Sequence, residues 1–186
     1  MHENAETVRV ALVTGGSGWI GRHYCAALQA AGMTVVAVDL RAPADQTPWP
    51  TVLCDVTSEQ DVREMVAAIR EQYGTIDILV ANAGGAMLPR KPFLGVQIED
   101  FNRVLALNLI SPWLLAKHVA PGMIGTGWGR IVMVSSGSVA TASPSGIGPY
   151  ISAKAGVVGM VRALANELGF SNLKVSGTFT LASFGP

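Results

Sequence analysis

The sequence has little charge, few cysteines and no long run of purely apolar residues. Charged residues make up 14% of its 186 residues, and the two cysteines, Cys25 and Cys54, form no paired motif. We expect both thiols to be reduced and buried, because this spacing suits neither a disulfide framework nor a metal site. The longest uncharged run, 131–153, is rich in Ser, Gly and Pro, which fits a strand and a loop better than a membrane span.

The charges that are present balance one another. The sequence has thirteen Lys and Arg residues and thirteen Asp and Glu residues, so it lacks the excess of basic residues that is typical of a nucleic-acid-binding protein. Residues 1–10 carry charges and lack the apolar region of a secretory signal. With 49% hydrophobic residues, the chain can bury a sizeable core. We expect a soluble, cytoplasmic, single domain over 1–186, with no nucleic-acid, membrane or metal partner.

Short apolar runs alternate with helical patterns along the chain. The pattern predicts strands at 8–13, 34–39, 52–54, 76–81, 130–135 and 173–179. It predicts helices at 19–31, 58–73, 98–109, 113–119 and 150–168, and a proline-rich loop at 41–50. This alternation indicates an α/β protein of the Rossmann type, a doubly wound parallel sheet in a three-layer α/β/α arrangement.

A glycine-rich turn follows the first predicted strand and opens the first predicted helix. Within it, Gly16, Gly18 and Gly21 satisfy the G-x-G-x-x-G pattern, whose glycines allow a tight turn and close approach of a dinucleotide diphosphate to a helix N-terminus. The strand–turn–helix context is what makes this short motif specific. The side chain of Trp19 could pack beside the cofactor, but the sequence favours it as an anchor on the helix face. We expect the cofactor to contact the whole turn: Gly15, Gly16, Ser17, Gly18, Trp19, Ile20 and Gly21.

An acidic residue at the end of the second predicted strand indicates which dinucleotide binds. Asp39 lies where a carboxylate accepts hydrogen bonds from the adenosine ribose, and its charge would repel a 2′-phosphate. The sequence therefore predicts NAD as the cofactor. Arg41 nearby leaves NADP as the lesser alternative.

A tyrosine and a lysine lie four residues apart in the last long predicted helix. Tyr150 and Lys154 therefore share one helix face. A phenol titrates near pH 10, and a neighbouring ammonium favours its ionised form. This pair is a candidate general acid and base.

These motifs occur together in one order: the glycine turn, Asn82-Ala83-Gly84, Asn108, a serine after the fifth predicted strand, and Tyr150-x-x-x-Lys154. The set resembles the short-chain dehydrogenase/reductase family over about Val8 to Val175. The glycine spacing T-G-x-x-G-x-x-G is similar to that of the family's extended branch, whereas most members with the later motifs read T-G-x-x-x-G-x-G.

The resemblance implies a role for each matching residue. Tyr150 would donate and accept the proton, Lys154 would hold the nicotinamide ribose, and Asn108 would anchor a water relay. The serine that orients the substrate oxygen would be Ser136, with Ser138 as the alternative, because an inserted residue in the following loop would explain the spacing. The remaining implied cofactor contacts are Asn82, Ala83 and Gly84 along the floor, and Asp55 and Val56 at the adenine.

The activity that the resemblance implies is NAD(P)-dependent transfer of a hydride between nicotinamide and a small carbonyl or secondary alcohol. A lyase or epimerase on the same scaffold, and a dinucleotide-binding protein without activity, are the alternatives. The substrate itself cannot be read from the sequence.

The end of the sequence departs from the family pattern. After the sixth predicted strand the family's Pro-Gly and Thr are absent, so we expect a domain incomplete at its C-terminus and a chain with little turnover. The helix segment 155–161 carries no charge, which predicts burial on both sides and a homodimer or homotetramer. The small residues Gly156 and Gly159 would allow the partner helix to approach closely.

Overall fold

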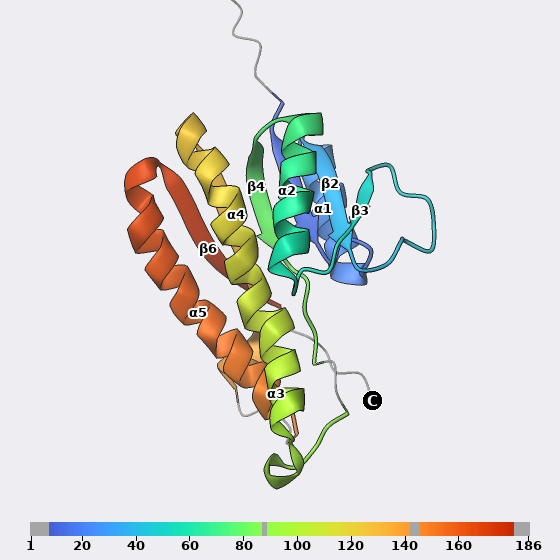
Figure 1. The fold of residues 1–186 in the computed structure, drawn as a ribbon, viewed down its shortest axis with the longest axis vertical. Coiled ribbons are helices and arrows are strands. Elements are labelled where there is room, and N and C mark those ends of the chain that lie inside the picture. The colour runs from blue at the N-terminus through green and yellow to red at the C-terminus, as the bar shows by residue number, and fades with distance from the viewer. Residues whose placement is uncertain (1–7, 87–88, 142–145, 181–186) are drawn as a thin grey trace, which may run out of the picture.

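One parallel sheet forms the centre of the protein. The computed structural model describes residues 8–86, 89–141 and 146–180. Its strands follow the order β3-β2-β1-β4-β5-β6, and every neighbouring pair is parallel (Figure 1). The strands are β1 (Val10–Thr14), β2 (Thr34–Asp39), β3 (Thr51–Leu53), β4 (Ile76–Ala81), β5 (Gly129–Ser136) and β6 (Leu173–Thr180).

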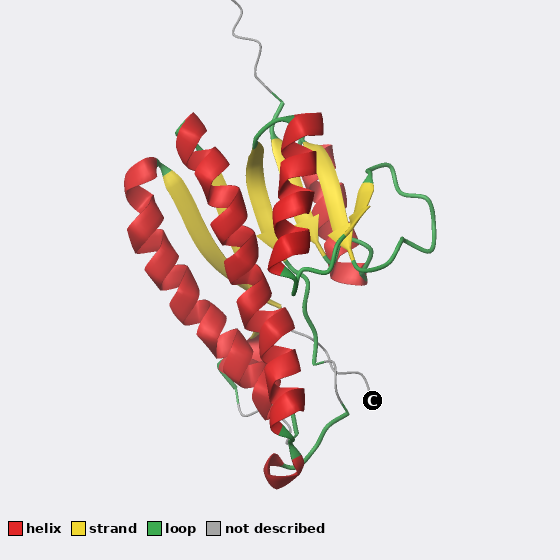
Figure 2. Ribbon diagram, viewed as in Figure 1, coloured by secondary structure: helices red, strands yellow, loops and turns green. Residues whose placement is uncertain are grey.

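Helices cover both faces of the sheet, as predicted for three layers. α1 lies behind the sheet in Figure 2, and α2, α4 and α5 lie in front of it. Separate hydrophobic clusters occupy the two faces, one containing Cys25 of α1 and the other Val62 of α2 and Leu115 of α4. The helices are α1 (Trp19–Ala30), α2 (Glu59–Tyr73), α3 (Ile98–Leu105), α4 (Ser111–Thr126) and α5 (Gly148–Leu168).

Local sequence signals fix the ends of α2. The Ser58 side chain accepts a hydrogen bond from the Asp61 N–H at 3.2 Å, and Gly74 ends the helix with a φ of +88°. The helix predicted at 58–73 agrees with both signals, because each depends only on neighbouring residues. The crossover from β2 to β3 is an irregular segment rather than a helix, as the prolines of 41–50 predict.

The helices between β4 and β5 differ from the prediction. α3, a π-helical turn (Ala106–Ile110) and α4 follow one another without a break, and α4 continues seven residues past the predicted end at Val119. Pro121 lies within α4 on an exposed side, where water can reach the carbonyl that loses its N–H partner. The second helix, predicted from residue 113, begins at Ser111 as α4, directly after the π-helical turn.

The segment 98–126 is long and apolar enough to span a membrane by length and composition alone. In this fold half of its most apolar window is buried, and α4 packs against α2, β4 and β5 as a core helix does. All six strands point their carboxyl ends toward the same edge of the sheet, which is where open α/β sheets bind ligands.

Candidate active site

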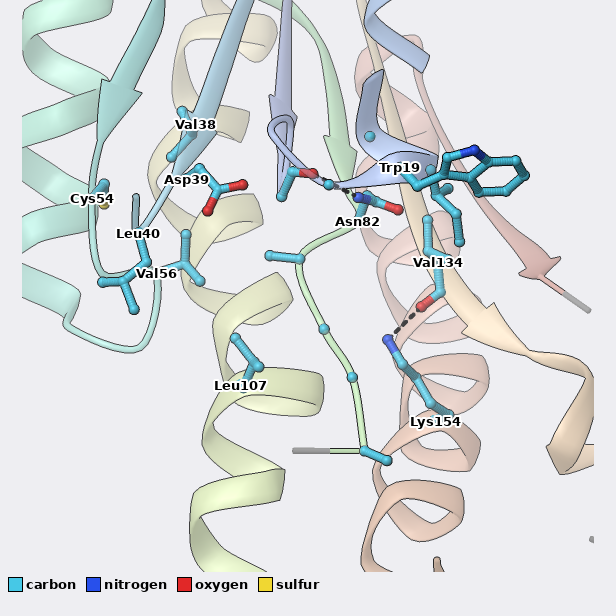
Figure 3. A pocket seen from close by; sticks show the side chains of 18 of the residues that line it. Trp19, Val38, Asp39, Leu40, Cys54, Val56, Asn82, Leu107, Val134 and Lys154 are labelled. Atoms are coloured by element: carbon cyan, nitrogen blue, oxygen red, sulfur yellow. Dashed lines mark hydrogen bonds between the residues drawn. The ribbon is translucent and has the colours of Figure 1, made fainter. Parts of the chain in front are cut away.

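A cavity of about 600 Å³ lies at the carboxyl edge of the sheet (Figure 3). Most of the residues predicted to bind a cofactor line this cavity, together with both members of the Tyr150–Lys154 pair. The predicted residues that line it are Gly15, Gly18, Trp19, Ile20, Gly21, Asp39, Asp55, Val56, Asn82, Ala83, Gly84, Tyr150 and Lys154. The predicted residues Gly16, Ser17, Asn108 and Ser136 lie outside this lining.

The glycines of the turn are required by packing within the turn itself. Gly15 has a φ of +67°, which favours glycine. A Cβ on Gly16 would lie 2.6 Å from the Cβ of Ala37, and a Cβ on Gly21 would lie 2.0 Å from the Gly15 carbonyl oxygen. Gly16 therefore brings the turn against β2, and Gly21 brings α1 against the turn.

The N-terminus of α1 is open toward an anion. Its N-cap is Gly18, which has no side chain to accept from the first N–H groups, and the first turn holds no acidic residue. Trp19, the first helical residue, has 78% of its surface exposed, so the predicted role as an anchor on the helix face is wrong. These features suit a diphosphate at this point.

The Asp39 carboxylate reaches back to the glycine turn. Its Oδ2 accepts a hydrogen bond from the Ser17 N–H at 3.0 Å. The Asp55 carboxylate instead stabilises the turn that follows it. Its Oδ1 accepts hydrogen bonds from both the N–H and the hydroxyl of Thr57, at 2.9 and 2.7 Å. A ribose diol therefore has a carboxylate available at the end of β2, and the adjoining wall includes Val56.

Thr14, which the sequence analysis did not single out, joins the ends of β1 and β4. Its hydroxyl oxygen accepts hydrogen bonds from the backbone N–H groups of Asn82 and Ala83, both at 3.1 Å, and it is fully buried. The Asn82 side chain in turn donates to the Thr14 carbonyl at 3.0 Å. A threonine that ends a buried strand directly before the glycine turn is the signal that could have identified it.

Asn108 lies in the π-helical turn and is fully buried. Its Oδ1 accepts from the Gly85 N–H and its Nδ2 donates to the Gly85 carbonyl, both at 2.9 Å. A Cβ on Gly84 would lie 2.7 Å from that Oδ1 and 3.0 Å from Lys154 Nζ. The amide therefore fixes the segment after β4, and Gly84 provides the space in which Asn108 and Lys154 approach each other.

Tyr150 and Lys154 are both buried at the N-terminal end of α5. Lys154 Nζ donates to the Val134 carbonyl at the end of β5 at 2.8 Å and lies 5.8 Å from the centroid of the Tyr150 ring. Burial disfavours the charged ammonium and lowers the pKa of Lys154 to about 8. The group can thus change its charge near physiological pH beside a phenol.

The two candidate serines lie together. Ser136 Oγ donates to Ser138 Oγ at 3.2 Å and accepts from the Ser138 N–H at 3.3 Å. The structure brings both hydroxyls to the end of β5 without separating their roles. The loop in which an inserted residue is expected lies partly in 142–145, outside the described residues.

Several lining residues were not predicted. They are mainly apolar and come from strand ends and the π-helical turn: Val38, Leu40, Cys54, Leu107, Val134 and Ser135, with Gly85 and Ala86. Both cysteines are buried and unpaired, as predicted, and burial raises the pKa of the Cys54 thiol to about 11. Among the residues that the structure describes, no group of three His, Cys, Asp or Glu side chains could hold a metal ion.

Comparison with known proteins gives consistent matches. The short chain dehydrogenase family profile matches residues 9–180. Mitochondrial borneol dehydrogenase from Lavandula x intermedia is 36% identical over 174 residues, which cover 90% of this chain and 66% of that protein. D-threitol dehydrogenase from Mycolicibacterium smegmatis is 32% identical, with coverage of 95% and 72%. NAD⁺-bound xylitol dehydrogenase has a TM-score of 0.85 at 27% identity, with coverage of 92% and 70%. The chain spans about two thirds of the length of these relatives.

The buried ammonium predicts a pH dependence of stability. Because the pKa of Lys154 falls to about 8 in the fold from 10.5, the unfolded chain binds more protons between these values. The unfolding free energy of the wild type should therefore rise with pH from 8 to 10.5 relative to Lys154→Met, by about 3 kcal/mol. Urea unfolding at several pH values measures this. The control is Lys117→Met, at an exposed ion pair with Glu59, which should keep the wild-type slope of unfolding free energy against pH. Parallel curves of unfolding free energy against pH for the wild type and Lys154→Met would contradict the prediction.

Proposed function

Because this chain belongs to the short chain dehydrogenase family, we propose that it transfers a hydride between a nicotinamide dinucleotide and a small carbonyl compound or secondary alcohol. One observation supports this above all: Tyr150 and Lys154 line the same cavity as the glycine turn and Asp39. A proton-transferring pair and a site suited to a dinucleotide therefore share one space.

The donors and acceptors of the cavity suit a dinucleotide. The uncapped N-terminus of α1 would receive the diphosphate, and the Asp39 carboxylate would accept from the adenosine ribose. Lys154 would hold the ribose at the other end of the cavity. When bound, the nicotinamide supplies or accepts the hydride at the substrate carbon.

The residues of α5 would manage the proton. In the reducing direction the Tyr150 hydroxyl gives its proton to the substrate oxygen, and in the oxidising direction the phenolate takes it back. The Lys154 ammonium stabilises the phenolate by its charge. As the family resemblance implies, Ser136 would orient the substrate oxygen, with the adjacent Ser138 as the alternative, and Asn108 would anchor the exchange of the proton with solvent.

Replacing the phenol tests this assignment. Tyr150→Phe should lower turnover at least about 100-fold, because the proton donor is lost, while the dissociation constant for the dinucleotide stays within about twofold. Steady-state assays over a panel of alcohols and ketones, including borneol and D-threitol, measure the first effect, and calorimetry measures the second. Tyr73→Phe, at the end of α2 and away from the cavity, is the control.

A Tyr150→Phe variant that retains most of its turnover would contradict the assignment. Dinucleotide binding by a wild-type chain that turns over no substrate would instead support a binding protein without activity.

We further propose that the cofactor is NAD(H) rather than NADP(H), since the Asp39 carboxylate would repel a 2′-phosphate at the ribose. NAD(H) should bind at least about tenfold more tightly than NADP(H), and Asp39→Ser should narrow that ratio by removing the charge. Dissociation constants for both cofactors measure the effect. The control is Glu71→Ser, on the exposed side of α2 and outside the cavity lining, which should leave the ratio unchanged. Equal binding of the two cofactors by the wild type would refute the preference.

The outward side of α4 and α5 supports self-association. Large apolar side chains are half-exposed at Ile110 of the π-helical turn and at Trp113 and Ile124 of α4, and Gly159 of α5 has nothing within 4 Å of where a Cβ would lie. Gly156, predicted to face a partner, instead packs against Leu109 of the same chain, because a Cβ there would lie 2.9 Å from that side chain. We propose a homodimer through this surface.

Light scattering measures the association directly. The wild type should have twice the mass of one chain at micromolar concentration, and Gly159→Glu should give the monomer mass, because it places a charge on the open side of α5. A glycine such as Gly32 cannot serve as the control, because Gly32→Glu would strain its positive φ. The control is therefore Gln60→Glu, which adds the same charge on the exposed side of α2 and should leave the dimer mass unchanged. A monomeric wild type would refute the dimer.

A further inference from the structure

The most exposed aromatic side chain beside the cavity is Trp19. It is the first residue of α1, and 78% of its surface is in contact with solvent. Burying an indole is among the largest apolar contributions a residue can make to a fold, and this residue does not make it. A large exposed apolar group at the rim of a cavity indicates contact with something other than the protein's own core.

The indole belongs to one end of the cavity. Figure 3 shows Trp19 on the same side as Val134 and Lys154, whereas Asp39, Cys54 and Val56 lie on the opposite side. The opposite side holds the carboxylate proposed to bind the adenosine ribose. Trp19 therefore lies at the end where Lys154 would hold the nicotinamide ribose.

The backbone and one neighbour hold the indole in place. Trp19 lies between Gly18 and Gly21, and Gly21 is packed so tightly that a Cβ would lie 2.0 Å from the Gly15 carbonyl oxygen. One turn further along α1, the His23 ring lies 4.6 Å from the indole, between centroids, and His23 Nδ1 lies 2.7 Å from the Trp19 carbonyl oxygen. The side chain is thus held in position although it is exposed.

We propose that Trp19 is a positioning residue for the nicotinamide half of the dinucleotide. This inference rests on the proposed function. The indole covers the nicotinamide ring from the solvent side, and it restricts the orientations open to that ring. The contact gains free energy from apolar surface that the fold leaves exposed, and the adenosine half, bound at the other end, gains nothing from it.

A pair of ligands separates the two halves. NADH carries the nicotinamide ring, and ADP-ribose has the same adenosine, diphosphate and second ribose without that ring, so the pair isolates the contribution of the ring. Trp19→Ala should raise the dissociation constant for NADH by about three- to tenfold and that for ADP-ribose by less than about twofold. Trp19→Phe should restore most of the NADH affinity, because a smaller ring still covers the same site. Calorimetry on the purified chain measures all of these constants.

A matched control is available on another helix. Trp113 of α4 is 47% exposed and does not line the cavity, so Trp113→Ala should change neither constant. Equal weakening of NADH and ADP-ribose in Trp19→Ala, or no weakening of NADH, would overturn the proposal. ADP-ribose binding by Trp19→Ala also reports that the variant is folded.

Fluorescence supplies a second measurement. Tryptophan emission overlaps the absorption of reduced nicotinamide, so energy transfer reports their proximity. Sensitised nicotinamide emission in the NADH complex should fall most in Trp19→Phe and stay near the wild-type value in Trp113→Phe. Equal losses in the two variants would place the indole away from the nicotinamide and overturn the proposal. A wild type that binds neither NADH nor ADP-ribose would instead refute dinucleotide binding itself.

Discussion

The side-chain amide of Asn108 is the contact on which the site depends. It is fully buried and bonds to both backbone groups of Gly85, so an unpaired amide here would cost about 1–3 kcal/mol. The π-helical turn is what directs this side chain toward the end of β4. Gly84 lies against both the amide and the Lys154 ammonium. The cavity floor, the π-helical turn and α5 therefore hold one another in position, although they are far apart in the sequence.

The sequence predicted the features that depend on neighbouring residues. The bounds of β2 and β4 agree with their β-branched apolar runs, and the cap at Ser58 and the stop at Gly74 agree with known helix-end chemistry. The clustering of Asp39 with the glycine turn also followed, because parallel strands bring their carboxyl ends to one edge. Most of the candidate site could be placed for this reason.

Features set by contacts between distant segments could not be predicted. The sequence predicts a helix end at 119, but α4 continues to Thr126, and Gly122 and Met123 are buried beyond that predicted end. The role of Gly156 depends on Leu109, which approaches only once the π-helical turn has formed. The hydrogen bonds of Thr14 join β1 to the residues after β4, and the apolar pattern of β1 alone does not indicate them. The exposure of Trp19 depends on what packs around α1, which the helical pattern of α1 does not indicate either.

The order of the strands has a consequence for synthesis. β1 pairs with both β2 and β4, so the strand made first lies near the middle of the finished sheet. Once β4 has left the ribosome, the glycine turn, Asp39 and the segment after β4 can assemble, whereas Tyr150 and Lys154 follow seconds later at about 5–20 residues per second. A nucleotide that binds the early half would stabilise a nascent chain before any catalytic group exists. The cofactor could therefore act as a folding aid during translation.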